Sequence, residues 1–292
     1  MLAKIFSATL HGLDAKIIEI EADVSNGMPA TTVVGLADAA IKESRERVRS
    51  CIRNSRQFSY PRNRISINLA PADIYKYGTH FDLGIALGIL AASGQITACL
   101  DGKIFFGELS LDGRLRPVKG ILPMLMAVKE AGFSNAFLPD GNKEEACFVS
   151  GLKIFPFTNI FQLISSIENG KPVPIIAAGA AQSGANRYPV DFAEVMGHAF
   201  AKRGLEIAAA GGHNVNLIGP PGVGKTMLAK AMFSILPRNT PEKLSEIIKI
   251  YSIAGLLGEN LDIVPFRNPH HNITMRSLRI LRTSDGFRWF IV

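Results

Sequence analysis

The sequence is poor in cysteine. It has only Cys51, Cys99 and Cys147, and it contains no Cys-x-x-Cys pair. An odd number of widely spaced cysteines argues against a disulfide framework and against a thiolate zinc site, so we expect buried, reduced thiols. The six histidines also lack a metal-binding spacing, and the tandem His270-His271 would direct its two side chains differently. Neither zinc nor disulfide bonds are therefore expected to organise the chain.

Long hydrophobic runs are missing as well. No apolar stretch approaches the roughly 18 residues that cross a bilayer. The N-terminal residues 1–11 lack the sustained apolar segment of an export signal. We therefore expect a cytoplasmic protein without a membrane partner. The 292 residues are 47% hydrophobic and 20% charged, which is enough to form about two domains.

Positive charge is concentrated in one segment. Between residues 42 and 64 the chain has eight lysines or arginines but only two glutamates. Apolar and small residues recur at helical spacing from residue 37 to residue 52, which predicts an amphipathic helix. Its opposite face would carry a basic stripe, defined here as Lys42, Arg45, Arg49, Arg53 and Arg56. This basic stripe could contact the phosphates of DNA, or it could equally be a solvated face or a subunit contact.

The first 168 residues alternate between strand-like and helix-like segments, which predicts a compact α/β domain. We expect strands at residues 2–9, 16–24, 30–35, 64–69, 103–109 and 135–139. We expect helices near residues 37–54, 81–93, 119–131 and 158–168. Residues 169–190 are rich in Gly, Pro, Ala, Ser and Gln, which is typical of a linker. A second domain should begin at residue 191, with helices near residues 198–210, 226–233 and 241–250.

A complete G-x-x-x-x-G-K-[ST] phosphate-binding loop lies in this second domain. It consists of Gly219, Pro220, Pro221, Gly222, Val223, Gly224, Lys225 and Thr226. Residues 214–218 before it are expected to form a short buried strand, and a helix should follow it. In that order the loop amides would converge on phosphate oxygens, Lys225 would reach the β and γ phosphates, and the Thr226 hydroxyl would ligate Mg²⁺. The alternative is a glycine-rich turn that ends in Lys-Thr by chance.

Further motifs accompany the loop. They are residues 191–195 with Gly197, residues 201–203, 205–214, 252–256 and 265–271. Together they resemble the magnesium-chelatase-like AAA+ ATPases of the YifB or ComM family, over about residues 1–274. The resemblance implies a Lon-protease/ribosomal-S5-like α+β domain at residues 1–168, followed by a partial P-loop AAA+ domain at residues 191–274. It also implies that the backbone near Val195 and Gly197 holds adenine.

The likeness to Lon-type domains is carried by the segment at residues 71–83 and by residues 107–109. A Lon-type peptidase needs a serine nucleophile and a lysine base within hydrogen-bond distance. Against that pattern the serine position falls on Phe81 and the lysine position falls on Leu122, so we expect a non-proteolytic domain. Thr79 and Lys119 are a nearby pair of suitable chemistry, but no motif supports them.

The family pattern continues into an inserted hairpin, an apolar strand ending in Asp-Glu, sensor residues and an arginine finger. None of these appears in the sequence, and residues 275–292 form an atypical tail that does not resemble the expected continuation. We therefore expect an incomplete AAA+ domain without a complete catalytic set, and a shifted reading frame would produce such a tail. Because hydrolysis needs a carboxylate at Mg²⁺ and an arginine, we expect negligible ATP turnover by this chain alone.

The resemblance makes an ATP-driven ring motor the leading hypothesis. It implies ATP and Mg²⁺ as cofactors, a homo-oligomeric ring, and branch migration of DNA during recombination or transformation. One alternative is a magnesium-chelatase-type ATPase subunit, although the fused Lon-like domain argues against it. An inactive remnant is a second alternative. An ATP-dependent peptidase is disfavoured by Phe81 and Leu122.

Overall fold

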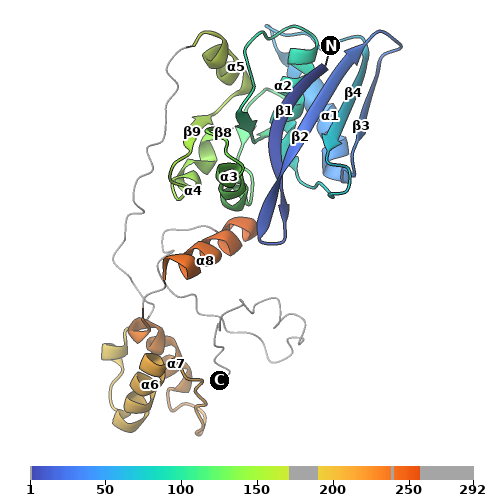
Figure 1. Cartoon of the computed structure of the whole chain (residues 1–292). Coiled ribbons are helices and arrows are strands. Elements are labelled where there is room, and N and C mark those ends of the chain that lie inside the picture. Colours follow the sequence, from blue (N-terminus) through green and yellow to red (C-terminus); the bar gives the residue numbers. More distant parts are fainter. Residues whose placement is uncertain (1, 171–189, 238–239, 257–292) are drawn as a thin grey trace. The chain divides into compact units, whose positions relative to one another are not determined.

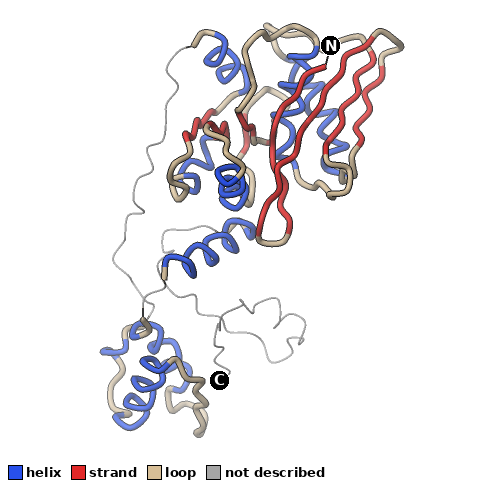
Figure 2. The backbone as a smooth tube through the Cα atoms, in the orientation of Figure 1, coloured by secondary structure: helices blue, strands red, loops and turns tan. Residues whose placement is uncertain are grey.

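The protein folds into two compact units in the computed structural model, which describes residues 2–170, 190–237 and 240–256. Unit 1 comprises Met1–Gln182 together with Glu246–Leu257, and unit 2 comprises Ser183–Ser245 and Gly258–Val292. The expected mixed α/β class is confirmed (Figures 1 and 2). The expected linker falls mostly on residues 171–189, and the atypical tail falls on residues 275–292; both segments lie outside the described residues.

A seven-stranded sheet forms the centre of unit 1. Its strands are β1 (Leu2–His11), β2 (Asp14–Ser25), β3 (Ala30–Val34), β4 (Arg64–Ala70), β5 (Lys103–Phe105), β8 (Asn135–Pro139) and β9 (Lys153–Phe157). Their order is β3-β4-β2-β1-β5-β8-β9. Only the β1/β2 and β2/β4 pairs are antiparallel, so the sheet is mostly parallel. The β1/β2 hairpin turns at Gly12, which adopts a left-handed φ of 68° that other residues rarely adopt.

Helices cover this sheet. They are α1 (Ala39–Asn54), α2 (Asp82–Ala92), α3 (Ile121–Glu130), α4 (Lys143–Ala146) and α5 (Ile160–Glu168), with short 3-10 turns η1 (Thr79–Phe81) and η2 (Asp140–Asn142). Figure 1 shows α1 and α2 together on one side of the β1–β4 part of the sheet. A Cβ atom at Gly84 of α2 would lie 2.5 Å from Ile20 Cδ1, so glycine permits the close contact of α2 with β2.

Helix α1 follows the expected amphipathic pattern. The Asp38 side chain accepts a hydrogen bond from the Ile41 amide at 2.7 Å, which satisfies a free donor at the helix start. The buried face consists of Ile41, Ser44, Val48, Cys51 and Ile52. The apolar residues of this face join the hydrophobic core of unit 1. The four basic-stripe residues within α1 lie outside this face, and Arg56 follows the end of the helix.

Several elements differ from the sequence-based expectation. The expected strand at residues 103–109 is interrupted at Gly107, and its second part, β6 (Glu108–Leu109), pairs instead with β7 (Leu115–Arg116). Strand β9 was not expected because Pro156 interrupts its pattern, but an edge strand tolerates a proline. The three cysteines are free; Cys51 is buried as expected, whereas Cys99 is exposed and Cys147 is half-buried.

Unit 2 is helical in its described part. It contains η3 (Phe192–Glu194), α6 (Ala199–Gly211), α7 (Lys225–Ala231) and η4 (Met232–Ile235), and helix α8 (Pro241–Ala254) begins in it. Its core is a small cluster that includes Val195, Leu205, Leu228 and Met232. Across both units, no helix among the described residues has the length and apolar character needed to span a membrane.

Candidate functional site

The phosphate-binding loop leads directly into α7. Gly222 and Gly224 adopt φ values of 82° and 85°, so both glycines use a left-handed conformation to form the turn. In the described part of the chain, no backbone hydrogen bond uses the amides of Val223, Gly224, Lys225 or Thr226. Free amides at a glycine-rich turn are the donors that phosphate oxygens accept from, so the loop's donor set fits a triphosphate.

Lys225 lies across the loop. Its Nζ donates to the carbonyl oxygens of Gly219 and Pro220, at 2.9 Å in each case. These carbonyls are satisfactory but replaceable partners for an ammonium group, and phosphate oxygens would bind it more strongly because they are charged. Thr226 is exposed at the first turn of α7, where its hydroxyl is available as a Mg²⁺ ligand.

The expected strand before the loop is wrong. Residues 213–220 form no regular secondary structure, and Ile218 is 90% exposed instead of buried. The physical reason is the lack of a partner, since the described part of unit 2 contains no β-strand that could pair with residues 214–218. The loop and its helix therefore form without the strand that was expected to position them.

The two residues expected to hold adenine, Val195 and Gly197, differ in their exposure to solvent. Val195 is 1% exposed and belongs to the core of unit 2, and its carbonyl accepts a hydrogen bond from Lys202 Nζ. Gly197 is exposed and has a left-handed φ of 71°. Backbone donors and acceptors for a base would therefore come from the exposed residues next to Val195, while the Val195 side chain anchors this segment. The adenine assignment stays a prediction.

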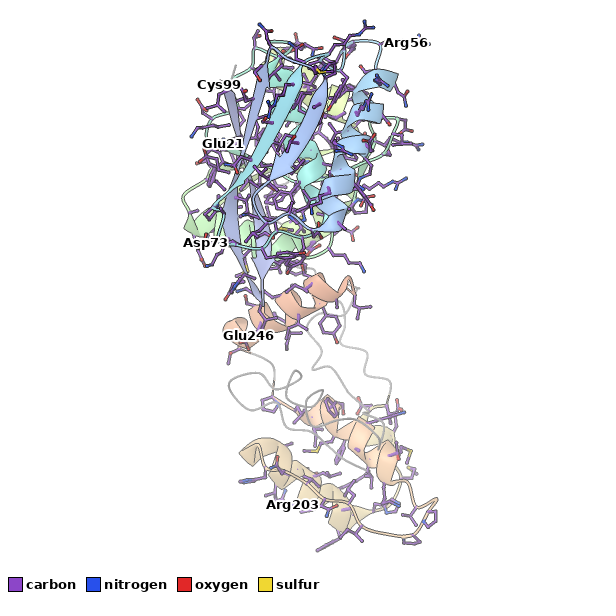
Figure 3. All side chains as sticks on the ribbon, turned by 90° about the vertical axis from the view of Figure 1, so that its right-hand side faces the viewer. Glu21, Arg56, Asp73, Cys99, Arg203 and Glu246 are labelled. Atoms are coloured by element: carbon purple, nitrogen blue, oxygen red, sulfur yellow. The ribbon has the colours of Figure 1, made fainter. Side chains whose placement is uncertain are left out.

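The basic stripe divides into two groups. A pocket beside the edge strand β3 is lined by three members of the stripe, Arg45, Arg49 and Arg53. Arg62, from the loop between α1 and β4, lines it as well. Lys42 and Arg56 do not line it. The side chain of Arg56 extends outward beyond the end of α1 (Figure 3). The sequence thus predicted the helix and its charge, but it did not predict that three of the five side chains share one concavity.

The positions expected for a Lon-type serine and lysine are buried apolar residues. Phe81 is fully buried and Leu122 is 2% exposed. The alternative pair is not assembled either: Thr79 donates to Glu108 Oε2 at 2.5 Å, and in the described chain no hydrogen bond links Thr79 to Lys119. Neither the Lon-type positions nor the Thr79–Lys119 pair therefore forms a hydroxyl–lysine dyad in the described structure.

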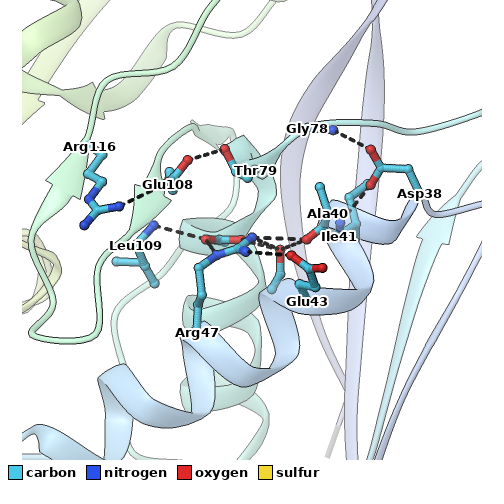
Figure 4. A network of polar contacts seen from close by, with 12 residues as sticks. Asp38, Ala40, Ile41, Glu43, Arg47, Gly78, Thr79, Glu108, Leu109 and Arg116 are labelled. Carbon is cyan, nitrogen blue, oxygen red and sulfur yellow. Dashed lines mark hydrogen bonds and ion pairs between the residues drawn. The ribbon is translucent and has the colours of Figure 1, made fainter.

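A network of polar contacts surrounds Asp82, the residue that follows Phe81 in the sequence (Figure 4). The fully buried Asp82 accepts hydrogen bonds from Arg47 Nε at 2.7 Å, from Arg47 Nη2 at 3.0 Å and from the Leu109 amide at 3.1 Å. The Ser44 hydroxyl donates to it as well. Burial raises the pKa of Asp82, whereas these donors oppose the rise. The network fastens α1 to the start of α2 and to β6, which is a structural role.

Comparison with known proteins places both units in one family. Residues 20–142 match the family described as subunit ChlI of Mg-chelatase, and residues 191–280 match the family described as magnesium chelatase, subunit ChlI. The competence protein ComM of Haemophilus influenzae is 38% identical over 286 residues, which cover 95% of this chain. The chain belongs to the YifB/ComM family of magnesium-chelatase-like proteins.

Other members of the YifB/ComM family match to the same extent. YifB of Salmonella typhimurium is 40% identical over 281 residues, covering 95% of this chain and 54% of that protein. The chain thus spans about half the length of the curated relatives it matches, and 55% of ComM. A Lon protease of Mycolicibacterium smegmatis is 24% identical over 170 residues, 53% of this chain and 21% of that protein. That match is consistent with the expected Lon/S5-like character of the N-terminal domain.

One YifB/ComM motif has a role that sequence reasoning missed. Within residues 252–256, Ser252 is 1% exposed and packs inside unit 1, where its hydroxyl donates to Glu145 and its carbonyl accepts from the Gly120 amide at 3.0 Å. Lys249 of the same helix pairs with Asp14 at 3.1 Å. The small residues of this motif could have indicated that the segment is closely packed, because close packing requires small side chains.

The described residues contain no group of three or more His, Cys, Asp or Glu side chains that could hold a metal ion. His270 and His271 lie outside the described residues, as does the rest of the motif at 265–271. The Mg²⁺ expected here would depend on a bound nucleotide, with Thr226 as its protein ligand.

Proposed function

We propose that this chain is the nucleotide-binding part of an ATP-driven AAA+ motor of the ComM type. The carrying observation is the loop at residues 219–226. Among the described residues, its amides at 223–226 form no backbone hydrogen bond, and Lys225 Nζ donates to two backbone carbonyls. On binding, Lys225 would exchange those carbonyls for phosphate oxygens, and Thr226 would hold Mg²⁺. Bound Mg-ATP would supply the phosphoryl group whose transfer drives such motors.

The remaining features of the proposal come from the family. The relative named a competence protein supports a role with DNA, and the full motor would be a homo-oligomeric ring in the cytoplasm that migrates DNA branches in recombination or transformation. Phe81 and Leu122 support a non-proteolytic role for unit 1, because neither side chain can act as nucleophile or base. Binding of DNA phosphates by the three residues of the basic stripe that share one pocket, Arg45, Arg49 and Arg53, is part of the same proposal.

Nucleotide binding is tested by calorimetric titration of Mg-ATP into the purified chain. We expect Lys225→Ala to weaken binding at least tenfold, because one charged contact to phosphate is lost. Lys230→Ala is a matched control, since Lys230 is an exposed lysine on the same helix α7. Thr226→Ala should remove the gain in affinity that Mg²⁺ provides. Equal affinities for the wild type and Lys225→Ala would refute the assignment of the loop.

The magnesium-chelatase alternative has one specific observation in its favour, namely that both family matches are described by subunit ChlI. A subunit of that kind would support Mg²⁺ insertion into a tetrapyrrole. The distinguishing measurement is ATP-dependent metallation of a porphyrin by the chain together with chelatase partner subunits. Product formation that depends on Lys225 would favour the chelatase role over the DNA motor, and no product would remove it.

A further inference from the structure

A pocket of about 480 Å³ lies between α1, the start of the edge strand β3 and the loop at residues 58–63. We call it the arginine pocket and define it by Arg45, Arg49, Arg53, Tyr60 and Arg62 with Thr31. Its volume is in the range of roughly 300–1,000 Å³ that ligand-binding pockets usually have. Four arginines face one concavity, and Glu46 is the single acidic residue that lines it.

Most of this positive charge is not neutralised. Arg45 is occupied, because it pairs with Glu46 at 3.1 Å and donates to the Thr31 carbonyl at 3.3 Å. Within the described chain, Arg53 and Arg62 form no ion pair or hydrogen bond, and the buried Nε of Arg49 has no hydrogen-bond partner. The exposed guanidinium groups of Arg53 and Arg62 are therefore the donors that an anion in the pocket would meet first.

The aromatic wall of the pocket is held in place. The Tyr60 hydroxyl lies 2.8 Å from Thr31 Oγ1, which fixes the ring against β3. The Arg49 guanidinium lies over the Tyr60 ring, 6.0 Å from its centroid, so the ring also orients one of the cations. Phe58 and Tyr60 are both partly buried against the core of unit 1, and Phe58 also stacks on Phe161, so a ligand would meet the part of the Tyr60 ring that lines the pocket.

We propose that the arginine pocket binds single-stranded DNA, with backbone phosphates at Arg49, Arg53 and Arg62 and a base against Tyr60. This inference rests on the proposed DNA function. It adds that the bound DNA is single-stranded and that the residues of the arginine pocket bind it. Positive charge combined with an aromatic surface is the pattern by which single strands are bound without sequence preference. A concave pocket suits a flexible strand, whereas a duplex hides its bases and offers phosphates to a broad surface.

The test compares two double variants by fluorescence anisotropy with a labelled oligothymidylate of about 12 nucleotides, a usual site size. Arg53→Gln with Arg62→Gln removes two exposed cations of the pocket. Lys42→Gln with Arg56→Gln removes two exposed cations outside it, with the same change of net charge. We expect the pocket pair to weaken binding about tenfold or more. Its slope of log K against log salt should fall by about 1.4, because each single-strand phosphate contact contributes about 0.7.

The control pair should weaken binding less than about threefold. Tyr60→Leu should weaken binding several-fold, whereas Tyr60→Phe should retain it because the ring remains. Thermal unfolding of each variant identifies any loss through misfolding, and the exposed double variants should melt as the wild type does.

Four results would overturn the inference. The first is equal loss in the pocket and control pairs, and the second is no loss in either pair while the wild type binds; the proposed DNA function survives both. The third is that inorganic phosphate competes as well as unlabelled single-stranded DNA does. The fourth is tighter binding of duplex than of single strands through the same arginines. A wild-type chain that binds neither single-stranded nor branched DNA would remove the proposed DNA function as well.

Discussion

Units 1 and 2 differ in what their apolar segments contact. In unit 1, β1 pairs with β2 on one side and with β5 on the other, and Ile5, Ile18 and Ile20 are buried in the core. In unit 2, residues 214–218 include two asparagines; Val215 and Leu217 pack against the core, but the segment forms no strand in the described structure and Ile218 is exposed. The comparison shows that a packing surface alone does not make such a segment a strand, because a strand also needs a neighbour that supplies hydrogen bonds.

The largest expected effect on stability comes from the buried ion pair of unit 1. Arg47→Met leaves the fully buried Asp82 carboxylate without its cation. We expect this to lower the free energy of unfolding by about 3–5 kcal/mol, as removal of one partner from a buried pair usually does. The measurement is chemical denaturation followed by circular dichroism.

Arg114→Met is the control for this prediction. Arg114 pairs with Asp112 at 2.7 Å, but both side chains are more than half exposed. The expected loss is therefore at most about 1 kcal/mol. If the two variants lost equal stability, burial of the Arg47–Asp82 pair would not determine its contribution.

A second prediction concerns the pH dependence of unit 1. His80 is buried, its Nε2–H donates to the Ala8 carbonyl at 2.7 Å, and burial lowers its pKa to about 4 from 6.5. Between these values the unfolded chain binds a proton that the folded chain does not bind. Stability should therefore fall as the pH drops from about 6.5 to about 4, by up to about 3 kcal/mol.

The check is denaturant unfolding at several pH values, together with an NMR titration of the His80 ring. His80→Gln removes the titrating group but keeps a possible donor to Ala8, so its stability should depend less on pH across this window. A His80 ring that titrates near pH 6.5 in the folded protein would contradict the prediction.

A third prediction tests whether residues 246–257 belong to unit 1. The Ser252 hydroxyl donates to Glu145, a residue whose pKa is raised by burial and which also accepts from the Leu122 amide at 3.1 Å. Ser252→Ala should lower the stability of unit 1 by about 1–3 kcal/mol, because a largely buried carboxylate loses one donor. Ser165→Ala, at an exposed position on α5, is the control and should cost less than about 0.5 kcal/mol. Equal melting curves for both variants would show that the 246–257 segment does not stabilise unit 1.

Much of unit 1 could be predicted from sequence because its periodicities are strong. Alternation in residues 16–24 and the helical spacing from residue 37 onward correspond to β2 and α1 as found. The misses have local causes. Gly107 interrupts an apolar run, and the proline within β9 conceals an edge strand. The hydrophobic periodicity of a segment reflects which of its side chains are buried. It therefore predicts secondary structure best where the segment packs against other parts of the same domain.

The candidate sites were predictable to different degrees. The phosphate loop is contiguous, so its residues could be named from the sequence alone, although its assignment to ATP stays a prediction. The arginine pocket combines α1 with Thr31, Tyr60 and Arg62, which only the fold brings together. The contact of Ser252 with Glu145 joins residues 107 positions apart, and no local pattern predicts such a pair.

The smallest expected effect completes the comparison between the units. Within the part of the chain that the structure describes, Lys225 Nζ bonds to backbone carbonyls of its own loop, so Lys225→Ala should change the stability of the nucleotide-free protein by less than about 0.5 kcal/mol. Mg-ATP at a hundred times the wild-type Kd should stabilise the wild type by about 2.7 kcal/mol, and the same substitution should reduce this stabilisation to about 1.4 kcal/mol or less. Thermal unfolding with and without Mg-ATP measures both quantities in one series. A large loss of stability without nucleotide would mean that Lys225 holds the fold of unit 2, and its effect on ATP affinity would then no longer identify a phosphate contact.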